Sequence, residues 1–84
     1  MITSRQVRAA RALLGWTQEL LADRALVALT ALKRLESERL PVRDTTREAV
    51  RKALEAAGIV FLTSDRREGV VLVREDIKKQ NEED

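Results

Sequence analysis

The fold of this chain is decided by residues 11 to 39, RALLGWTQELLADRALVALTALKRLESER. Gly15 is placed to end one helix, and Thr17 is placed to cap the next one. Apolar residues then recur at helical spacing, as in the buried stripe of a small helical protein. They are Leu21, Ala22, Ala25, Leu32 and Leu35. The stretch predicts two short amphipathic helices, about 18 to 25 and 29 to 36, joined by a tight turn.

The second of these helices is expected to present a basic face to solvent. Leu29, Thr30, Lys33 and Arg34 lie away from its apolar stripe. A face with two cations and a short polar side chain suits the major groove of DNA, where such groups can bond base edges. The pattern therefore favours a helix-turn-helix DNA reader.

Further helices are predicted on both sides of this stretch. Thr3 and Gln6 form a capping box ahead of a helix that ends near Leu14. Thr45 and Glu48 form a second capping box, which opens a helix running through residue 57, with Gly58 after it as the terminator.

The pattern changes from helical to β after Gly58. The runs 59 to 63 and 70 to 74 are rich in β-branched residues and flank the polar stretch SDRREG, which predicts a hairpin. The expected fold is mainly α, with about four helices and a C-terminal β-hairpin. The predicted units are a DNA-binding domain over 1 to 58, a hairpin for dimerisation or docking over 59 to 74, and a flexible acidic tail over 75 to 84.

Composition narrows the function classes. The 84 residues include no Cys and no His, which removes thiolate and imidazole chemistry and the common zinc sites. We expect no catalytic residue, no metal and no cofactor. Residues 1 to 54 hold 11 Lys or Arg against 6 acids, and residues 55 to 84 hold 5 against 8, so the two parts carry about +5 and −3. A basic front half is typical of a protein that meets a polyanion. Since no apolar run approaches the roughly 18 residues of a membrane span, a cytoplasmic protein is expected.

The sequence resembles the Xre family of helix-turn-helix regulators, which includes lambda repressor and Cro. The resemblance covers about residues 4 to 57 and rests on Trp16-Thr17-Gln18-Glu19 followed by the spacing of the later apolar positions. It implies a lambda-repressor-like DNA-binding bundle. It also implies an ion pair between Arg11 and Glu36 that has a structural role.

The resemblance further implies which positions meet DNA. Residues expected to read bases are Ala28, Leu29, Thr30, Lys33 and Arg34. Residues expected to contact phosphates are Thr17, Gln18, Ser37, Arg39 and Arg43.

Two residues depart from the family pattern. Leu26 replaces the usual glycine at the end of the first helix of the pair, and a leucine at positive φ costs about 1 to 2 kcal/mol. Ala28 replaces the frequent serine cap, a loss of about 1 kcal/mol. Local propensity would allow one continuous helix here, but the flanking pattern favours the turn.

Three functions remain open at this point. The favoured one is a homodimeric repressor or autoregulator of a bacterial or phage operon, bound to double-stranded DNA. The second is an antitoxin or anti-factor that also grips a protein partner through its hairpin or acidic tail, and the third is an interaction module with a decayed reading head. The residues expected at the dimer or partner interface are Ile59, Phe61, Val71 and Val73. An enzyme is not expected, because no base is present to activate a serine or threonine.

Overall fold

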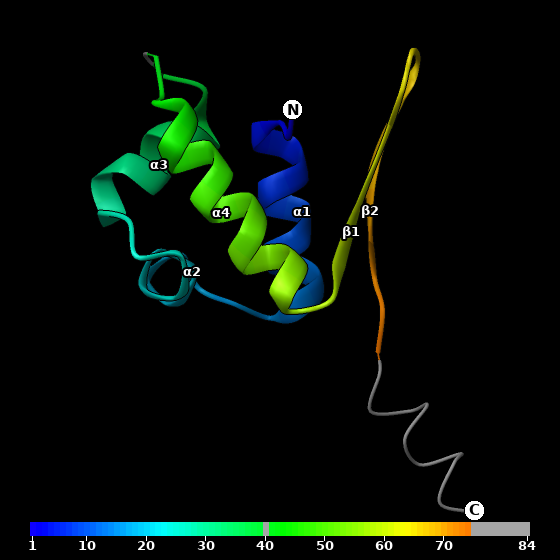
Figure 1. Cartoon of the computed structure of the whole chain (residues 1–84), viewed down its shortest axis with the longest axis horizontal. Helices are drawn as coiled ribbons and strands as arrows, with labels where there is room; N and C mark the ends of the chain where they lie inside the picture. Colours follow the sequence, from blue (N-terminus) through cyan, green and yellow to red (C-terminus); the bar gives the residue numbers. More distant parts are fainter. Residues whose placement is uncertain (40, 75–84) are drawn as a thin grey trace, which may run out of the picture.

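A computed structural model describes residues 1–39 and 41–74, so the predicted acidic tail lies outside the described residues. Within these residues the chain forms four helices followed by an antiparallel two-stranded hairpin, which confirms the predicted mainly α fold class (Figure 1). The elements are α1 Ser4–Leu14, α2 Gln18–Ala25, α3 Leu29–Ser37, α4 Asp44–Ala56, β1 Ile59–Ser64 and β2 Arg67–Leu72. None of the helices in these described ranges is both long enough and apolar enough to cross a membrane.

The first helix begins and ends as its sequence predicts. The Gln6 amide donates to Oγ1 of Thr3 at 3.2 Å, and the Thr3 amide donates to Oε1 of Gln6 at 3.0 Å, which completes the capping box. Gly15 ends α1 in the left-handed region, with φ 70°. Two of the four free amides at the start of α1 are therefore satisfied within the chain.

The turn between α2 and α3 is present, and local propensity for one long helix is overridden. Thr17 caps α2 by accepting from the Leu20 amide at 3.0 Å. Leu26 then takes φ 58°, and the Val27 amide donates to the Ala22 carbonyl at 3.0 Å. Tertiary packing accounts for the choice, because half-buried Val27 packs against the core only when the chain turns here.

The second predicted capping box is wrong. Arg43 is the N-cap of α4 and makes no side-chain capping bond, and the first helical hydrogen bond runs from the Arg47 amide to the Arg43 carbonyl at 3.1 Å. Thr45 therefore lies inside the first turn instead of capping it. The helix starts two residues earlier than this capping box predicts, and Asp44 in its first turn is compatible with the positive end of the helix dipole.

The hairpin is tighter than the sequence indicates. Ser64 pairs with Arg67, which leaves a two-residue turn of Asp65 and Arg66, and the second strand occupies residues 67 to 72 instead of the predicted 70 to 74. The polar stretch predicted as a loop is thus partly strand. The reason is tertiary, because α1 supplies hydrogen bonds to this end of the hairpin.

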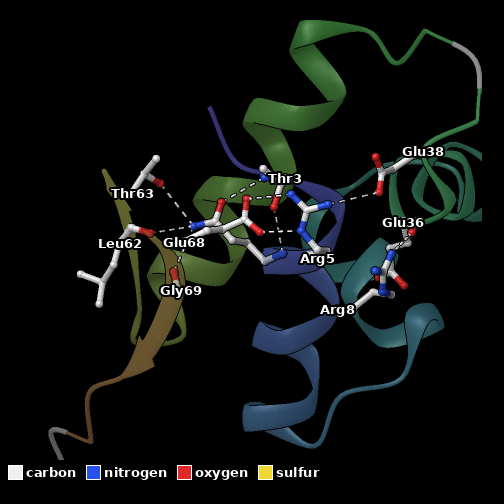
Figure 2. Close-up of polar contacts among 10 residues, drawn as sticks. Thr3, Arg5, Arg8, Glu36, Glu38, Leu62, Thr63, Glu68 and Gly69 are labelled. Atoms are coloured by element: carbon white, nitrogen blue, oxygen red, sulfur yellow. Dashed lines mark hydrogen bonds and ion pairs between the residues drawn. The ribbon is translucent and has the colours of Figure 1, made fainter. Parts of the chain in front are cut away.

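Gln6 and Arg5 of α1 hold the hairpin in place. Figure 2 shows Arg5 next to Glu68 of the hairpin. Nε2 of Gln6 donates to the carbonyl of Leu62 at 3.1 Å and to that of Gly69 at 3.0 Å. Arg5 forms two bonds with the carboxylate of Glu68, from Nε at 2.7 Å and from Nη2 at 3.2 Å. One buried amide and one arginine therefore fix both strands against the start of α1.

The core lies between the helices and the inner side of the hairpin. The buried apolar residues come from the N-terminal segment, all four helices and β1, which makes one continuous core. They are Ile2, Val7, Ala10, Leu21, Ala22, Ala25, Leu32, Leu35, Val50, Leu54 and Ile59. Because Ile59 belongs to this core, the hairpin packs as part of the helical unit.

Candidate nucleic-acid interface

The solvent-facing side of α3 carries most of the side chains predicted to read bases. Thr30, Lys33 and Arg34 are exposed on α3, and Ala28 is exposed at its N-cap. Leu32 and Leu35 on the opposite side are at most 1% exposed. This division leaves α3 with one face that is anchored in the core and another that is free to enter a groove.

Leu29 does not have the outward position expected from the sequence. Its side chain is half-buried and packs against the core, two residues after Val27, which packs there too. The base-reading prediction is therefore corrected to a set of polar and small residues without a large apolar member. Leu26, the residue before Val27 in the turn, is the most exposed of the large apolar residues in the described ranges, at 91%.

Four exposed cations lie on this face or in the segment that follows α3. Lys33 and Arg34 lie on α3, and Arg39 and Arg43 lie in the segment that leads to α4; all four are exposed. Within residues 1–39 and 41–74, none of the four takes part in an ion pair. Since no carboxylate of the described chain neutralises them, their charge is available to an external polyanion.

A groove of about 550 Å³ runs between the α2–α3 turn, α3 and the start of α4. Thr30, Arg34 and Arg43 contribute polar groups to it, and Ala28 and Arg43, the N-caps of α3 and α4, also line it. Neither N-cap makes a side-chain capping bond. The first amides of both helices thus keep the positive ends of two helix dipoles at one groove, an arrangement that favours phosphate oxygens.

The position of α3 is fixed from behind by a buried ion pair. Nε and Nη2 of Arg11 donate to the two carboxylate oxygens of Glu36 at 2.7 and 2.8 Å, and Nη1 donates to the carbonyl of Trp16 at 3.1 Å. Glu36 is only 4% exposed. The hydrogen bonds that Arg11 donates to Glu36 raise the pKa of the Arg11 guanidinium above its ordinary value, so Arg11 stays charged. The pair expected from the resemblance is therefore present and joins α1 to α3.

Gln18 belongs to the same network. Its Nε2 donates to Oε1 of Glu36 at 3.0 Å, which ties the first residue of α2 to α3. Its side chain is half-buried and its donor group faces the interior, so a contact of that donor with a phosphate would require this bond to break. Of the two α2 positions predicted to meet phosphates, only Thr17 is exposed, and its hydroxyl caps the helix.

Ser37, Arg39 and Arg43 occupy exposed positions near the end of α3 and after it. The hydroxyl of Ser37 donates to the carbonyl of Lys33 at 2.8 Å, a local bond that is common at helix ends. Both arginines lie in the segment between α3 and α4, and Arg43 lines the groove. The structure thus brings Arg34 and Arg43 to one groove, while Ser37 bonds back to its own helix.

Sequence reasoning missed the side chains that connect the hairpin to α3. Figure 2 shows Arg5 between Glu68 of β2 and Glu38, the C-cap of α3, with Nη1 of Arg5 3.8 Å from Oε2 of Glu38. Arg8 donates to the carbonyl of Glu36 at the end of the same helix. The signal in the sequence was that α1 carries polar residues such as Arg5 and Arg8 beside an apolar stripe that was already complete.

The predicted interface residues of the hairpin divide between its two faces. Ile59 is 2% exposed within this chain, and Phe61 is half-buried against the core, so both point inward and the interface prediction is corrected for them. Val71 and Val73 are 44% and 47% exposed and face outward. The alternation of side chains along a pleated strand explains the error. Ile59 and Phe61 are two residues apart on β1, so both side chains point to the inner face of the hairpin.

Models of known protein families and the sequences of curated proteins give no match to this chain. The function must therefore be inferred from the residues and their arrangement.

Proposed function

We propose that this chain is a sequence-specific, double-stranded DNA-binding transcriptional regulator that acts in the bacterial cytoplasm as a homodimer, with α3 in the major groove. The proposal is a binding function without a catalytic step. The observation that carries it is the pairing of an exposed, basic α3 face with a rigid buried support for the same helix. A reader needs both, because a side chain distinguishes bases only when its helix is held in one orientation.

The proposed reading groups are on α3. Lys33 and Arg34 donate to O6 and N7 of guanine, Thr30 bonds either kind of base edge, and the methyl of Ala28 contacts thymine. A preferred site should then contain G·C pairs and at least one T. The resemblance of residues 4 to 57 to the Xre regulators supports the same assignment.

The proposed phosphate groups flank the reading helix. Arg43 and the uncapped amides of α3 and α4 border one groove, and Arg39 is exposed nearby in the sequence. A backbone phosphate at this groove would orient α3 without adding sequence information. Arg11 has no part in DNA contact in this proposal, because Glu36 and the Trp16 carbonyl occupy its donors.

The decisive experiment is fluorescence anisotropy of the purified chain with duplexes tiled across the region upstream of its own gene. A scrambled duplex serves as the control, and each titration is repeated at two salt concentrations. We expect one tile to bind at least about 1,000-fold more tightly than the scrambled duplex. Equal affinity for every duplex, or no salt-dependent binding at all, would contradict a specific reader.

A further inference from the structure

Leu26 occupies a backbone position that glycine fills more easily. Its φ is 58°, in the left-handed region, where a residue with a Cβ is strained. Backbone bonds hold the turn, since the amides of Leu26 and Val27 donate to the carbonyls of Asp23 at 3.2 Å and Ala22 at 3.0 Å. A glycine would make the same bonds without strain. The leucine side chain is therefore not required by the turn to which it belongs.

The packing of the described chain makes almost no use of this side chain. Leu26 is 91% exposed, and it belongs neither to the buried core nor to the partly buried residues packed against the core. Figure 1 shows the turn between α2 and α3 on the side of the helices away from the hairpin. A strained residue whose side chain does not stabilise the described fold points to a functional position, because such strain is concentrated at binding and active sites.

The surroundings of Leu26 favour DNA as the molecule that its side chain contacts. Leu26 lines the groove between α3 and the start of α4, together with Ala28, Thr30, Arg34 and Arg43. None of the residues that line this groove in the described ranges is acidic. An apolar side chain in a groove whose charged groups are all cations suits a polyanion that also exposes apolar groups. Duplex DNA is such a molecule, because the C5 methyl of thymine lies in its major groove.

We propose that Leu26 is a specificity-determining residue, whose side chain packs against the C5 methyl of a thymine beside the bases that α3 reads. The proposal rests on the proposed function and adds a contact to the same site. Because consecutive Cα atoms are about 3.8 Å apart, those of Leu26 and Ala28 are separated by at most about 7.6 Å. Bases along one strand are about 3.4 Å apart. The thymine should thus lie within about two base pairs of the base that Ala28 contacts.

Anisotropy with the preferred duplex tests the contribution of the side chain. L26A shortens the side chain and keeps the Cβ, and L26G also removes the backbone strain. Both variants should bind the preferred duplex about five- to tenfold more weakly than the unchanged chain. The slope of log affinity against log salt should stay the same, because no phosphate contact is lost.

L13A is the matched control, because Leu13 is 48% exposed but lies on α1 and does not line the groove. It should bind the preferred duplex as tightly as the unchanged chain does. Circular dichroism of each variant verifies that it is folded.

Deoxyuridine in the duplex tests the contact with the methyl group. It pairs as thymine does and lacks only the C5 methyl, so each thymine of the preferred duplex is replaced in turn. At one thymine the replacement should weaken binding of the unchanged chain about fourfold, the value of one buried methyl, and should have no effect on L26A or L26G. A thymine that Ala28 alone contacts should give the same loss in all three proteins, since its contact is independent of Leu26.

The outcomes distinguish this contact from the proposed function. Selective binding that is equally tight in the unchanged chain, L26A and L26G would overturn the contact alone and leave the leucine free for a protein partner. Weaker binding by L26G alone would also overturn it, because the effect would then come from a loosened turn. So would losses at every deoxyuridine that are equal in the three proteins. If the unchanged chain binds no duplex selectively, both proposals fail.

Discussion

Arg11 of α1 and Glu36 of α3 form a two-bond ion pair, at 2.7 and 2.8 Å, directly behind the exposed face of the proposed reading helix. The side chain of Glu36 is 4% exposed and that of Arg11 is 21% exposed. The carboxylate also accepts from Gln18, so one buried group connects three helices. The orientation of α3 therefore depends on a polar interaction as well as on the apolar core.

Removal of one partner of this pair should be costly. Arg11→Ala leaves Glu36 buried without its cation, and the loss in the free energy of unfolding should be about 3 to 5 kcal/mol. Replacement of both residues by apolar side chains, as in R11M with E36L, should cost less than the single change. Urea denaturation of R11M, E36L and the R11M/E36L double variant measures this coupling. A single-variant loss below about 1 kcal/mol would show that the pair is not needed for stability.

Alanine substitutions of the cations in the proposed DNA interface should have two kinds of effect on DNA binding. Lys33→Ala and Arg34→Ala should each cost about 1 to 3 kcal/mol on the preferred duplex and reduce discrimination between sequences. Arg39→Ala and Arg43→Ala should weaken binding to all duplexes alike and reduce the slope of log affinity against log salt by about one. Anisotropy with preferred and scrambled duplexes compares the four variants. Uniform effects from all of them would show that α3 does not read bases.

The turn at Leu26 should be improved by glycine. Leu26 has φ 58° and a side chain that is 91% exposed, so Leu26→Gly relieves backbone strain without removing a buried group. We expect a gain of about 1 kcal/mol in the free energy of unfolding. Urea denaturation measures it, with Glu38→Gly as a comparison at the other non-glycine residue of positive φ, 57°. A loss of stability in L26G would mean that the leucine side chain makes a contact that outweighs the strain.

Gly58 should not tolerate a side chain. It has φ 104°, and a Cβ added there would lie 2.6 Å from the Val73 carbonyl oxygen. Gly58→Ala should therefore weaken the junction between α4 and the hairpin and cost about 1 to 3 kcal/mol. The control is Gly69→Ala, since a Cβ at Gly69 meets no heavy atom within 4 Å. Thermal denaturation of both variants is the measurement, and equal melting temperatures would contradict the predicted clash.

Acid should loosen the hairpin at its turn end. The hydrogen bonds from Arg5 lower the pKa of the Glu68 carboxyl below its ordinary value. A carboxyl with a lowered pKa in the folded state stabilises that state above its unfolded pKa, and the contribution is lost as the pH falls through the lower, folded pKa. Amide chemical shifts of β2, followed by NMR from about pH 6 to about pH 3, report this change.

Glu68→Gln is the control for the acid effect. The amide cannot titrate, so the shifts of β2 in E68Q should no longer change with the titration of this residue. The Gln6 bonds to Leu62 and Gly69 contain no titratable group and should hold the strands in both proteins. An unchanged acid transition in E68Q would assign it to another carboxyl, such as Glu48, whose pKa is also lowered by its bonds with Arg51.

The sequence by itself determined the helices, their main end signals and the division of α3 into buried and basic sides. These features follow from local chemistry, since Thr3, Gly15 and Thr17 act through bonds to amides or φ preferences within a few residues. The Arg11–Glu36 pair was accessible only through a resemblance, because its partners are 25 residues apart.

Tertiary structure decided what local signals leave open. Leu26 accepts positive φ because the turn lets Val27 reach the core, and the capping box at Thr45 is unused because α4 begins at Asp44. The inner and outer sides of the hairpin were also undetermined, since apolar residues occupy both registers of its strands. Two residues of α1, far away in the sequence, decide which face the core covers. Gln6 binds the carbonyls of Leu62 and Gly69, and Arg5 binds the carboxylate of Glu68.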